Sequence, residues 1–94
     1  MSISIVMLTY NNYEKFMRSM NSMFYFITEP KIKEFIFLDN GSHEVELKKF
    51  LRSLEKQIEK VRVIFSDTNL GIAKGRKVLF DTAEGEYIAS FDSD

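Results

Sequence analysis

This chain of 94 residues contains no cysteine, and it has a single proline and a single histidine. Without cysteine it forms no disulfide bond and offers no thiolate to a metal ion, which fits a reducing compartment. The formal net charge of -1 provides no electrostatic attraction toward nucleic acid or an anionic membrane. The length suits one domain with its own hydrophobic core, and no repeat, linker or low-complexity segment divides it.

The N-terminus lacks the basic region and the small-residue cleavage site of a signal peptide. Its apolar run from Ile3 to Leu8 is interrupted by polar residues from Thr9 to Asn12, so it is too short to span a bilayer. We therefore expect a cytoplasmic protein, with attachment to the inner face of a membrane left open. The histidine, His43, follows a turn, and we interpret it as a surface or capping residue because no nucleophile lies beside it.

Short apolar runs alternate with segments of helical periodicity along the whole chain. The apolar runs predict buried strands at residues 3–8, 34–38, 61–65 and 87–91. Apolar residues at helical spacing predict helices over about 12–28, over a stripe from 47 to 58, and over about 72–83. This alternation predicts right-handed crossovers and a three-layer α/β fold around a mostly parallel sheet.

Capping residues are predicted at three element ends. Asn11 followed by Glu14 resembles a capping box at the start of the first helix. Ser42, after an Asn-Gly turn, is suited to cap the second helix. Gly85 is predicted to take the left-handed conformation that often ends a helix.

Polar residues gather where each predicted strand ends, at residues 9–12, at 39, at 67–71 and at 92–94. In an α/β sheet, ligands bind beyond the carboxyl ends of the strands. Residues two apart on a strand point the same way, so Asp92 and Asp94 would face one side and suit Mg²⁺ or Mn²⁺. Turns between strands and helices also need Asn, Asp, Ser and Gly, so this pattern alone leaves a site and ordinary turns equally open.

Segments from all four clusters match a known family in order and spacing. They are Ser4 to Asn11, Phe37 to Ser42, Asn69 to Arg76, and Phe91 to Asp94. Together they resemble the N-terminal, nucleotide-sugar-binding part of family 2 glycosyltransferases, which are inverting enzymes with the GT-A fold. The resemblance covers the whole chain, residues 1–94, and implies a Rossmann-like sheet with strand order 3-2-1-4.

The resemblance also implies roles for individual residues. Asp39 would accept a hydrogen bond from the base, for which uracil is the natural expectation. Asp92 and Asp94 would hold Mn²⁺ or Mg²⁺, with Asp92 also near the ribose, and the metal would act as a Lewis acid on the departing nucleoside diphosphate. The remaining residues implied to border the nucleotide sugar are Thr9, Tyr10, Asn11, Asn69, Gly71, Lys74 and Arg76.

Two departures from the family limit what the resemblance implies. Lys77 stands where the family often has asparagine, so no role is carried over there. The general base and the acceptor site of the family lie further downstream, so we expect this chain to be part of a longer enzyme and to be inactive alone. That enzyme would transfer a hexosyl group to an acceptor hydroxyl in glycan or polysaccharide synthesis.

Two further expectations concern alternatives and partners. A non-catalytic α/β module that binds a nucleotide or a protein partner is the alternative function. A receiver-like version of it is disfavoured, because residues 9–12 contain no acid. If the fourth strand lies at a sheet edge, its unpaired backbone groups invite pairing with a second copy of the chain.

Overall fold

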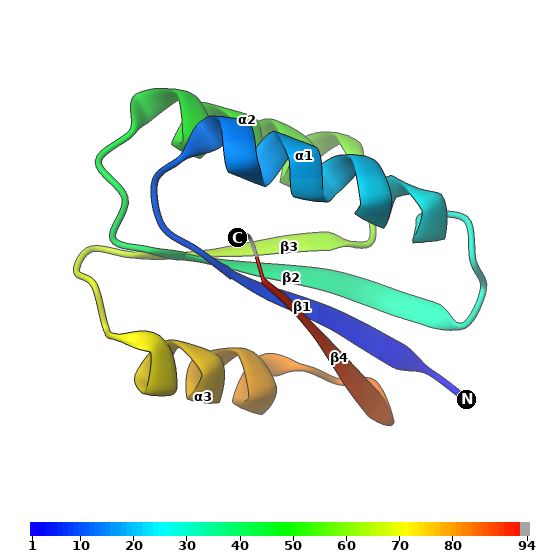
Figure 1. Ribbon diagram of the computed structural model, residues 1–94. Coiled ribbons are helices and arrows are strands. Elements are labelled where there is room, and N and C mark those ends of the chain that lie inside the picture. The colour runs from blue at the N-terminus through cyan, green and yellow to red at the C-terminus, as the bar shows by residue number, and fades with distance from the viewer. Residues whose placement is uncertain (93–94) are drawn as a thin grey trace.

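The computed structural model describes residues 1–92, which form a four-stranded sheet with helices on both faces (Figure 1). The alternation of strands and helices predicted from the sequence is therefore confirmed. In chain order the elements are β1 (Ile3–Thr9), α1 (Tyr13–Met23), a short 3-10 helix η1 (Phe24–Phe26), β2 (Ile32–Asn40), α2 (Val45–Gln57), β3 (Val61–Ser66), α3 (Ile72–Thr82) and β4 (Tyr87–Asp92).

The strands lie in the order β3-β2-β1-β4, and every neighbouring pair is parallel. This confirms the expected order 3-2-1-4. The chain moves outward from β1 to β2 and β3, then returns to place β4 on the other side of β1. Because right-handed crossovers in opposite directions put their helices on opposite faces, α1 and α2 cover one face and α3 covers the other (Figure 1). The order reverses beside β1, and ligands bind at such a switch point in α/β sheets.

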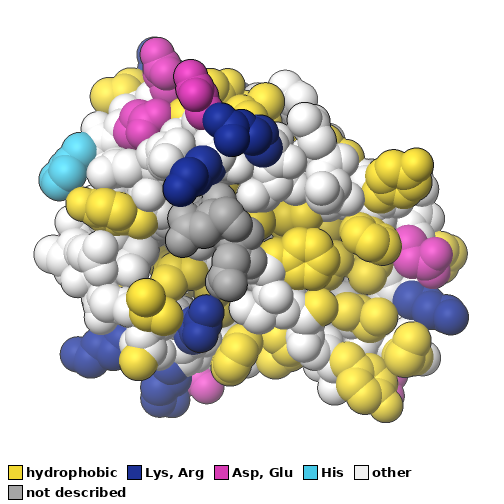
Figure 2. Space-filling view, viewed as in Figure 1, with side chains coloured by type: hydrophobic (Ala, Val, Ile, Leu, Met, Phe, Trp, Pro, Cys, Tyr) yellow, Lys and Arg dark blue, Asp and Glu magenta, His cyan; other side chains and the backbone are white. Residues whose placement is uncertain are grey.

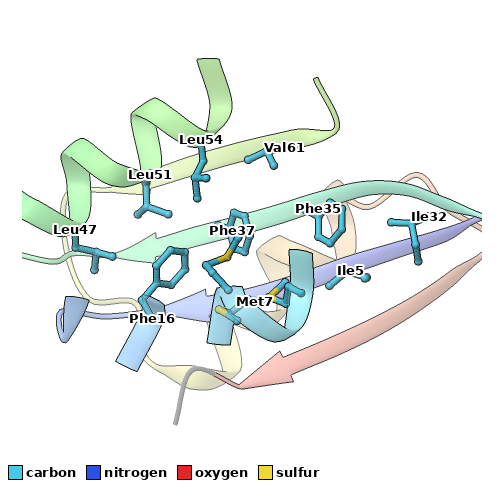
Figure 3. Close-up of a cluster of buried hydrophobic side chains, with 12 residues drawn as sticks. Ile5, Met7, Phe16, Ile32, Phe35, Phe37, Leu47, Leu51, Leu54 and Val61 are labelled. Atoms are coloured by element: carbon cyan, nitrogen blue, oxygen red, sulfur yellow. The ribbon is translucent and has the colours of Figure 1, made fainter. Parts of the chain in front are cut away.

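The main hydrophobic core lies between the sheet and the α1/α2 layer. Phe16 of α1 meets Phe37 of β2 edge to face, with ring centroids 5.5 Å apart, a geometry that aromatic pairs prefer. The leucines of α2 point toward the same strand (Figure 3). The buried members of this core are Ile5, Met7, Phe16, Met20, Met23, Ile32, Phe35, Phe37, Leu47, Leu51, Leu54 and Val61.

A smaller core lies between the sheet and α3. Val6, Ile36, Leu38 and Leu79 are its buried members. Gly75 brings α3 close to the sheet, because a Cβ at this position would lie 2.7 Å from a methyl carbon of Leu8. The Gly75 position of α3 therefore faces the strands.

The ends of two elements, α1 and β2, differ most from the sequence prediction. α1 ends at Met23 and continues as the 3-10 helix η1, whereas the periodicity predicted one helix to about residue 28. Hydrogen bonds from Ile27 N–H to the Phe24 carbonyl and from Glu29 N–H to the Phe26 carbonyl tighten this end, as 3-10 turns do at helix termini. β2 is also longer than the apolar run predicted, because Ile32 and Asp39 pair with β1 and Asn40 pairs with β3.

The amino-terminal edge of the sheet holds a buried carboxylate. Glu34 is 4% exposed, and it accepts hydrogen bonds from Ser4 Oγ at 2.6 Å, Glu84 N–H at 2.7 Å and Arg62 Nη1 at 3.1 Å. Burial raises the pKa of Glu34, but the hydrogen bonds from Ser4, Glu84 and Arg62, with the Arg62 charge, together lower that pKa below its usual value. One side chain thus joins β1, β2, β3 and the segment that enters β4.

Gly85 lies at the same edge, and its predicted left-handed conformation is wrong. Only Gly41 and Gly71 among the glycines have positive φ angles. Gly85 is needed for a different reason, because a Cβ there would lie 2.7 Å from the backbone nitrogen of Ser4. Its N–H donates to Ser4 Oγ at 2.8 Å, so the entry to β4 packs directly on β1.

No helix within residues 1–92 combines the length and the apolar character needed to cross a bilayer.

Candidate functional site at the carboxyl edge of the sheet

The carboxyl ends of all four strands meet at one edge, so the polar clusters predicted from the sequence come together there. Thr9 at the end of β1 pairs with Asp39 of β2, and Leu8 pairs with Asp92 of β4. On the other side of β2, Asn40 pairs with Ser66 at the end of β3. Parallel pairing therefore places residues from four separate parts of the sequence side by side.

Successive residues of a strand point to opposite faces of the sheet, so the polar side chains at this edge divide between the two faces. Met7 and Phe37 belong to the core beneath α1 and α2, so Thr9 and Asp39, each two residues later, lie on that same face. Asn40 lies on the α3 face, where it contacts the loop before α3. The edge therefore contains two polar groups, one on each side of the sheet.

The first group has two buried atoms without partners. Asp39 is 0% exposed and Thr9 is 1% exposed. Within the described part of the chain, Asp39 Oδ2 and Thr9 Oγ1 are the buried side-chain oxygen or nitrogen atoms that make no hydrogen bond. A buried polar atom left unpaired costs about 1–3 kcal/mol, and native structures contain few of them. Here two such atoms lie on paired residues of adjacent strands, at the edge where α/β sheets bind ligands.

The other Asp39 oxygen, Oδ1, has a hydrogen-bond partner within the protein. Ser42 Oγ donates a short hydrogen bond to Asp39 Oδ1 and accepts one from Asn11 N–H at 2.7 Å. Asn11 has a left-handed φ of 50°, and its side-chain oxygen accepts from the backbone N–H groups of His43 and Glu44 at 2.9 and 3.2 Å. The loop after β1 is thus bound to the loop after β2.

These contacts correct two capping predictions. Asn12, not Asn11, caps α1, because Asn12 has a φ of 57° and its side chain accepts from Lys15 N–H at 3.2 Å. Ser42 does not cap α2; the residue before that helix is Glu44, which makes no side-chain cap. Both predictions considered neighbours in sequence, whereas Asn11 and Ser42 bond to each other across 31 positions.

The second polar group holds the loop before α3. Asn40 is 3% exposed; its Nδ2 donates to Asn69 Oδ1 at 3.1 Å, and its Oδ1 accepts from Leu70 N–H at 2.8 Å. Asn69 Oδ1 also accepts from Gly71 N–H at 2.8 Å. The side-chain oxygen of Asn69 therefore stabilises the turn before α3. The sequence prediction missed the buried Asn40, which anchors this turn to β2. A polar residue directly after the strand aspartate was the available signal.

The other predicted residues frame this edge from outside. Tyr10 is 46% exposed, and Lys74 and Arg76 lie on the exposed side of α3. Gly71, with a φ of 82°, directly precedes α3, and a Cβ there would meet nothing within 4 Å. Open space beside a helix N-terminus with two nearby cations suits an anionic ligand.

The predicted metal ligands are at the end of the described chain. Asp92 ends β4 beside Leu8 of β1, and Asp94 lies outside the described residues. Within residues 1–92 no three His, Cys, Asp or Glu side chains gather as a metal-binding group. The predicted roles of Asp92 and Asp94 as Mg²⁺ or Mn²⁺ ligands therefore stay a prediction from the sequence.

Comparison with known proteins relates this chain to a group of enzymes. The sequence model described as Glycosyl transferase family 2 matches residues 4–94. An uncharacterized glycosyltransferase of Methanocaldococcus jannaschii is 30% identical over 96 residues, which cover 98% of this chain and 31% of that protein.

Solved structures share the fold at lower identity. S. aureus TarS (residues 1–349) has a TM-score of 0.80 and 24% identity, over 100% of this chain and 28% of that one. GalNAc-T7 with UDP, GalNAc and Mn²⁺ has a TM-score of 0.85 and 20% identity, over 98% and 17%. Mannosyltransferase PcManGT from Pyrobaculum calidifontis, with GDP-Man and Mn²⁺, has a TM-score of 0.80 and 18% identity, over 98% and 27%.

This chain thus spans less than a third of the length of each of these proteins. The structural similarities establish the GT-A fold, and the family match covers nearly the whole sequence. The chain belongs to glycosyl transferase family 2.

Proposed function

We propose that this chain binds the nucleoside diphosphate part of a sugar donor at the carboxyl edge of its sheet. The observation that carries the proposal is the pair of unsatisfied buried atoms, Asp39 Oδ2 and Thr9 Oγ1. A carboxylate oxygen accepts hydrogen bonds only, whereas a hydroxyl group both donates and accepts. A nucleobase with an N–H group beside a carbonyl, such as uracil or guanine, satisfies both atoms at once. Since Asp39 is buried, a base that bonds to Oδ2 would have to enter the interior of this edge.

The phosphates would lie further out, toward the described cations. Lys74 and Arg76 are exposed on α3, and their charges would offset those of the diphosphate. Tyr10, Asn11, Asn69 and Gly71 complete the proposed border of the nucleotide. Asn11 and Asn69 contribute by shaping the backbone, because their side-chain oxygens already accept hydrogen bonds within the protein.

We assign the divalent metal of this proposal, Mn²⁺ or Mg²⁺, to Asp92 and Asp94. Hard oxygen ligands suit both ions, and two of the structural neighbours contain Mn²⁺. A metal held there would supply Lewis-acid stabilisation to a departing nucleoside diphosphate. The whole protein would then transfer a sugar to an acceptor hydroxyl in glycan synthesis.

Calorimetric titration with UDP and with GDP in the presence of Mn²⁺ tests the donor site. We expect Asp39→Asn to weaken binding of the preferred nucleotide by about 10- to 100-fold, because one hydrogen bond to a charged group is lost. The amide also presents a donor where the base needs an acceptor. The preferred nucleotide, uridine or guanosine, identifies the base.

Asp81→Asn is the matched control for this titration. Asp81 is an exposed carboxylate on α3 that forms an ion pair with the exposed Lys77. The same chemical change there should leave binding intact. Replacing Mn²⁺ with EDTA, and separately changing Asp92 and Asp94 to Asn, should also weaken binding if the metal is held there. Equal affinity of wild type and Asp39→Asn for every nucleotide would contradict the proposal.

We further propose that β4 pairs with a second copy of the chain. β4 is an edge strand in the described sheet, bonded to β1 on one side only, and unpaired strand edges invite such pairing. Figure 2 shows hydrophobic side chains at the surface between α1 and β4. The β4 side of this face includes Tyr87, which is 60% exposed, and the half-buried Ala89 and Phe91.

Sedimentation velocity over a wide range of protein concentrations tests this pairing. We expect a dimer in the wild type and a monomer in Tyr87→Lys, because charged residues on an edge strand oppose edge-to-edge association. Val45→Lys is the control, since Val45 is 61% exposed and begins α2 after the carboxyl end of β2, whereas Tyr87 begins β4 at the amino-terminal edge of the sheet. A monomer at every concentration would refute the pairing.

A further inference from the structure

The hydroxyl of Ser42 divides the two oxygens of the Asp39 carboxylate into different roles. A serine hydroxyl has one proton to donate, and Ser42 gives it to Asp39 Oδ1. Its lone pair accepts the N–H of Asn11 at 2.7 Å. Both residues are almost fully buried, with Ser42 2% and Asp39 0% exposed. Oδ1 is therefore satisfied within the protein, and Oδ2 is the acceptor that remains.

The backbone around Ser42 is held in place from the β1 side. The side-chain oxygen of Asn11 binds the N–H groups of His43 and Glu44, directly after Ser42. In return, Glu44 Oε1 accepts from Tyr13 N–H at 3.0 Å. Three elements thus converge on the position of one hydroxyl group: the end of β1, the start of α1 and the loop before α2.

This arrangement has a consequence for the carboxylate. If the Asp39 carboxylate rotated out of its present plane, it would lose the Ser42 hydrogen bond without gaining another from the described residues. A half turn only exchanges two equivalent oxygens and restores the same arrangement. Hydrogen bonds to charged groups are among the stronger ones in proteins. The carboxylate is therefore held in one orientation before any ligand arrives, which is the condition for preorganised binding.

We infer that Ser42 is a positioning residue, which holds Asp39 so that Oδ2 faces the nucleobase of the donor. This inference rests on the proposed donor site. It differs from a purely structural role of Ser42, since it requires that Ser42 affect recognition of the base and that it act through Asp39.

A double-mutant cycle with two ligands tests the inference. The variants are Ser42→Ala, Asp39→Ala and the combination of both, and the ligands are the preferred nucleoside diphosphate and inorganic pyrophosphate, each titrated with Mn²⁺. We expect Ser42→Ala to weaken nucleotide binding by about 3- to 10-fold, the net effect of one lost hydrogen bond. Pyrophosphate, which has no base, should bind with unchanged affinity. In the Asp39→Ala background, Ser42→Ala should have no further effect.

Ser42→Thr keeps the hydroxyl and should restore nucleotide affinity, whereas Ser42→Cys has a similar shape and a weak donor and should resemble Ser42→Ala. Thermal unfolding of each variant verifies that it is folded, and the Thr and Cys variants decide the question if Ser42→Ala is not. Two results would overturn the positioning role alone. One is loss of pyrophosphate binding in Ser42→Ala, and the other is an equal loss of nucleotide affinity from Ser42→Ala in the wild-type and Asp39→Ala backgrounds. Failure of the wild type to bind any nucleoside diphosphate would instead overturn the donor site on which it rests.

Discussion

Gly41→Ala is expected to lower the free energy of unfolding by about 3–5 kcal/mol, at the upper end of what single substitutions do. Gly41 has a φ of +83°, and a Cβ there would lie 2.6 Å from the carbonyl carbon of Thr68 and 2.7 Å from the nitrogen of Asn69. Both are backbone atoms, so no side-chain rotation relieves the contact. The loop before α3 would have to move away from the end of β2.

Gly71→Ala is the matched control for this substitution. Gly71 has nearly the same φ, +82°, but a Cβ there would meet nothing within 4 Å. It should therefore cost only the conformational strain of an alanine at φ 82° and ψ 169°, a backbone region almost confined to glycine, about 1–3 kcal/mol. Chemical denaturation of both variants gives the difference, which measures how closely the two loops approach. Equal losses would mean that the contact between Gly41 and Thr68 is not present in solution.

Movement of the loop before α3 should also affect ligand binding. Asn69 and Gly71 belong to the proposed border of the nucleotide, and Asn40 holds them against β2. We expect Gly41→Ala to weaken nucleotide binding even under conditions where the variant is fully folded, because this anchor is displaced.

Glu34→Gln is expected to lower the free energy of unfolding by about 2–4 kcal/mol at neutral pH, since hydrogen bonds to a buried charged group are lost or weakened. Three donors converge on this carboxylate, from Ser4, Arg62 and the backbone of Glu84. An amide NH₂ in place of one oxygen turns a donor toward another donor. The Arg62 side chain is 47% exposed, so solvent screens the ion pair and most of the loss comes from the buried hydrogen bonds.

The effect of Glu34→Gln should depend on pH in one direction. The pKa of Glu34 in the folded protein lies below its ordinary value of 4.5, so the folded state binds this proton less readily than the unfolded state. The stabilisation is therefore complete above pH 4.5 and is lost as the pH falls through the lower, folded-state pKa. The glutamine side chain of Glu34→Gln does not titrate, so the difference in stability between wild type and this variant should shrink in acid.

Denaturation of wild type and Glu34→Gln across this pH range measures the difference directly. Glu59→Gln provides the control, because Glu59 is an exposed acid between α2 and β3 and its loss should change stability little. A difference between wild type and Glu34→Gln that is constant from neutral to acid pH would show that Glu34 is not ionised and bonded as described.

The succession of strands and helices along the chain could be predicted from the sequence because it depends on local patterns. Apolar runs, helical spacing and the polar residues between them are visible along the chain, and each reflects the burial of one side of one element. The boundaries were less predictable. The ends of β2 depend on pairing with β1 and β3, and the 3-10 end of α1 depends on hydrogen bonds between residues three apart. Apolar periodicity reports neither.

The gathering of polar residues at one edge was predictable for the same reason, since parallel strands all end on the same side. Their individual roles were not. Asn40, Ser42 and Asn69 looked like turn residues or site residues alike, and the structure shows that their side chains hold loops together. Glu34 looked like the edge of an apolar strand, yet it is buried among donors from three other segments.

The sequence by itself thus determined the α/β class, the edge of the sheet where a site can form, and, through its motifs, the family. Only the tertiary structure decided which polar atoms at that edge are used internally and which remain for a ligand. The physical reason is the distance along the chain between hydrogen-bonding partners, 31 positions for Asn11 with Ser42 and 29 for Asn40 with Asn69. Asp39 Oδ2 and Thr9 Oγ1 became recognisable as unpaired only when every neighbour brought by the fold was known.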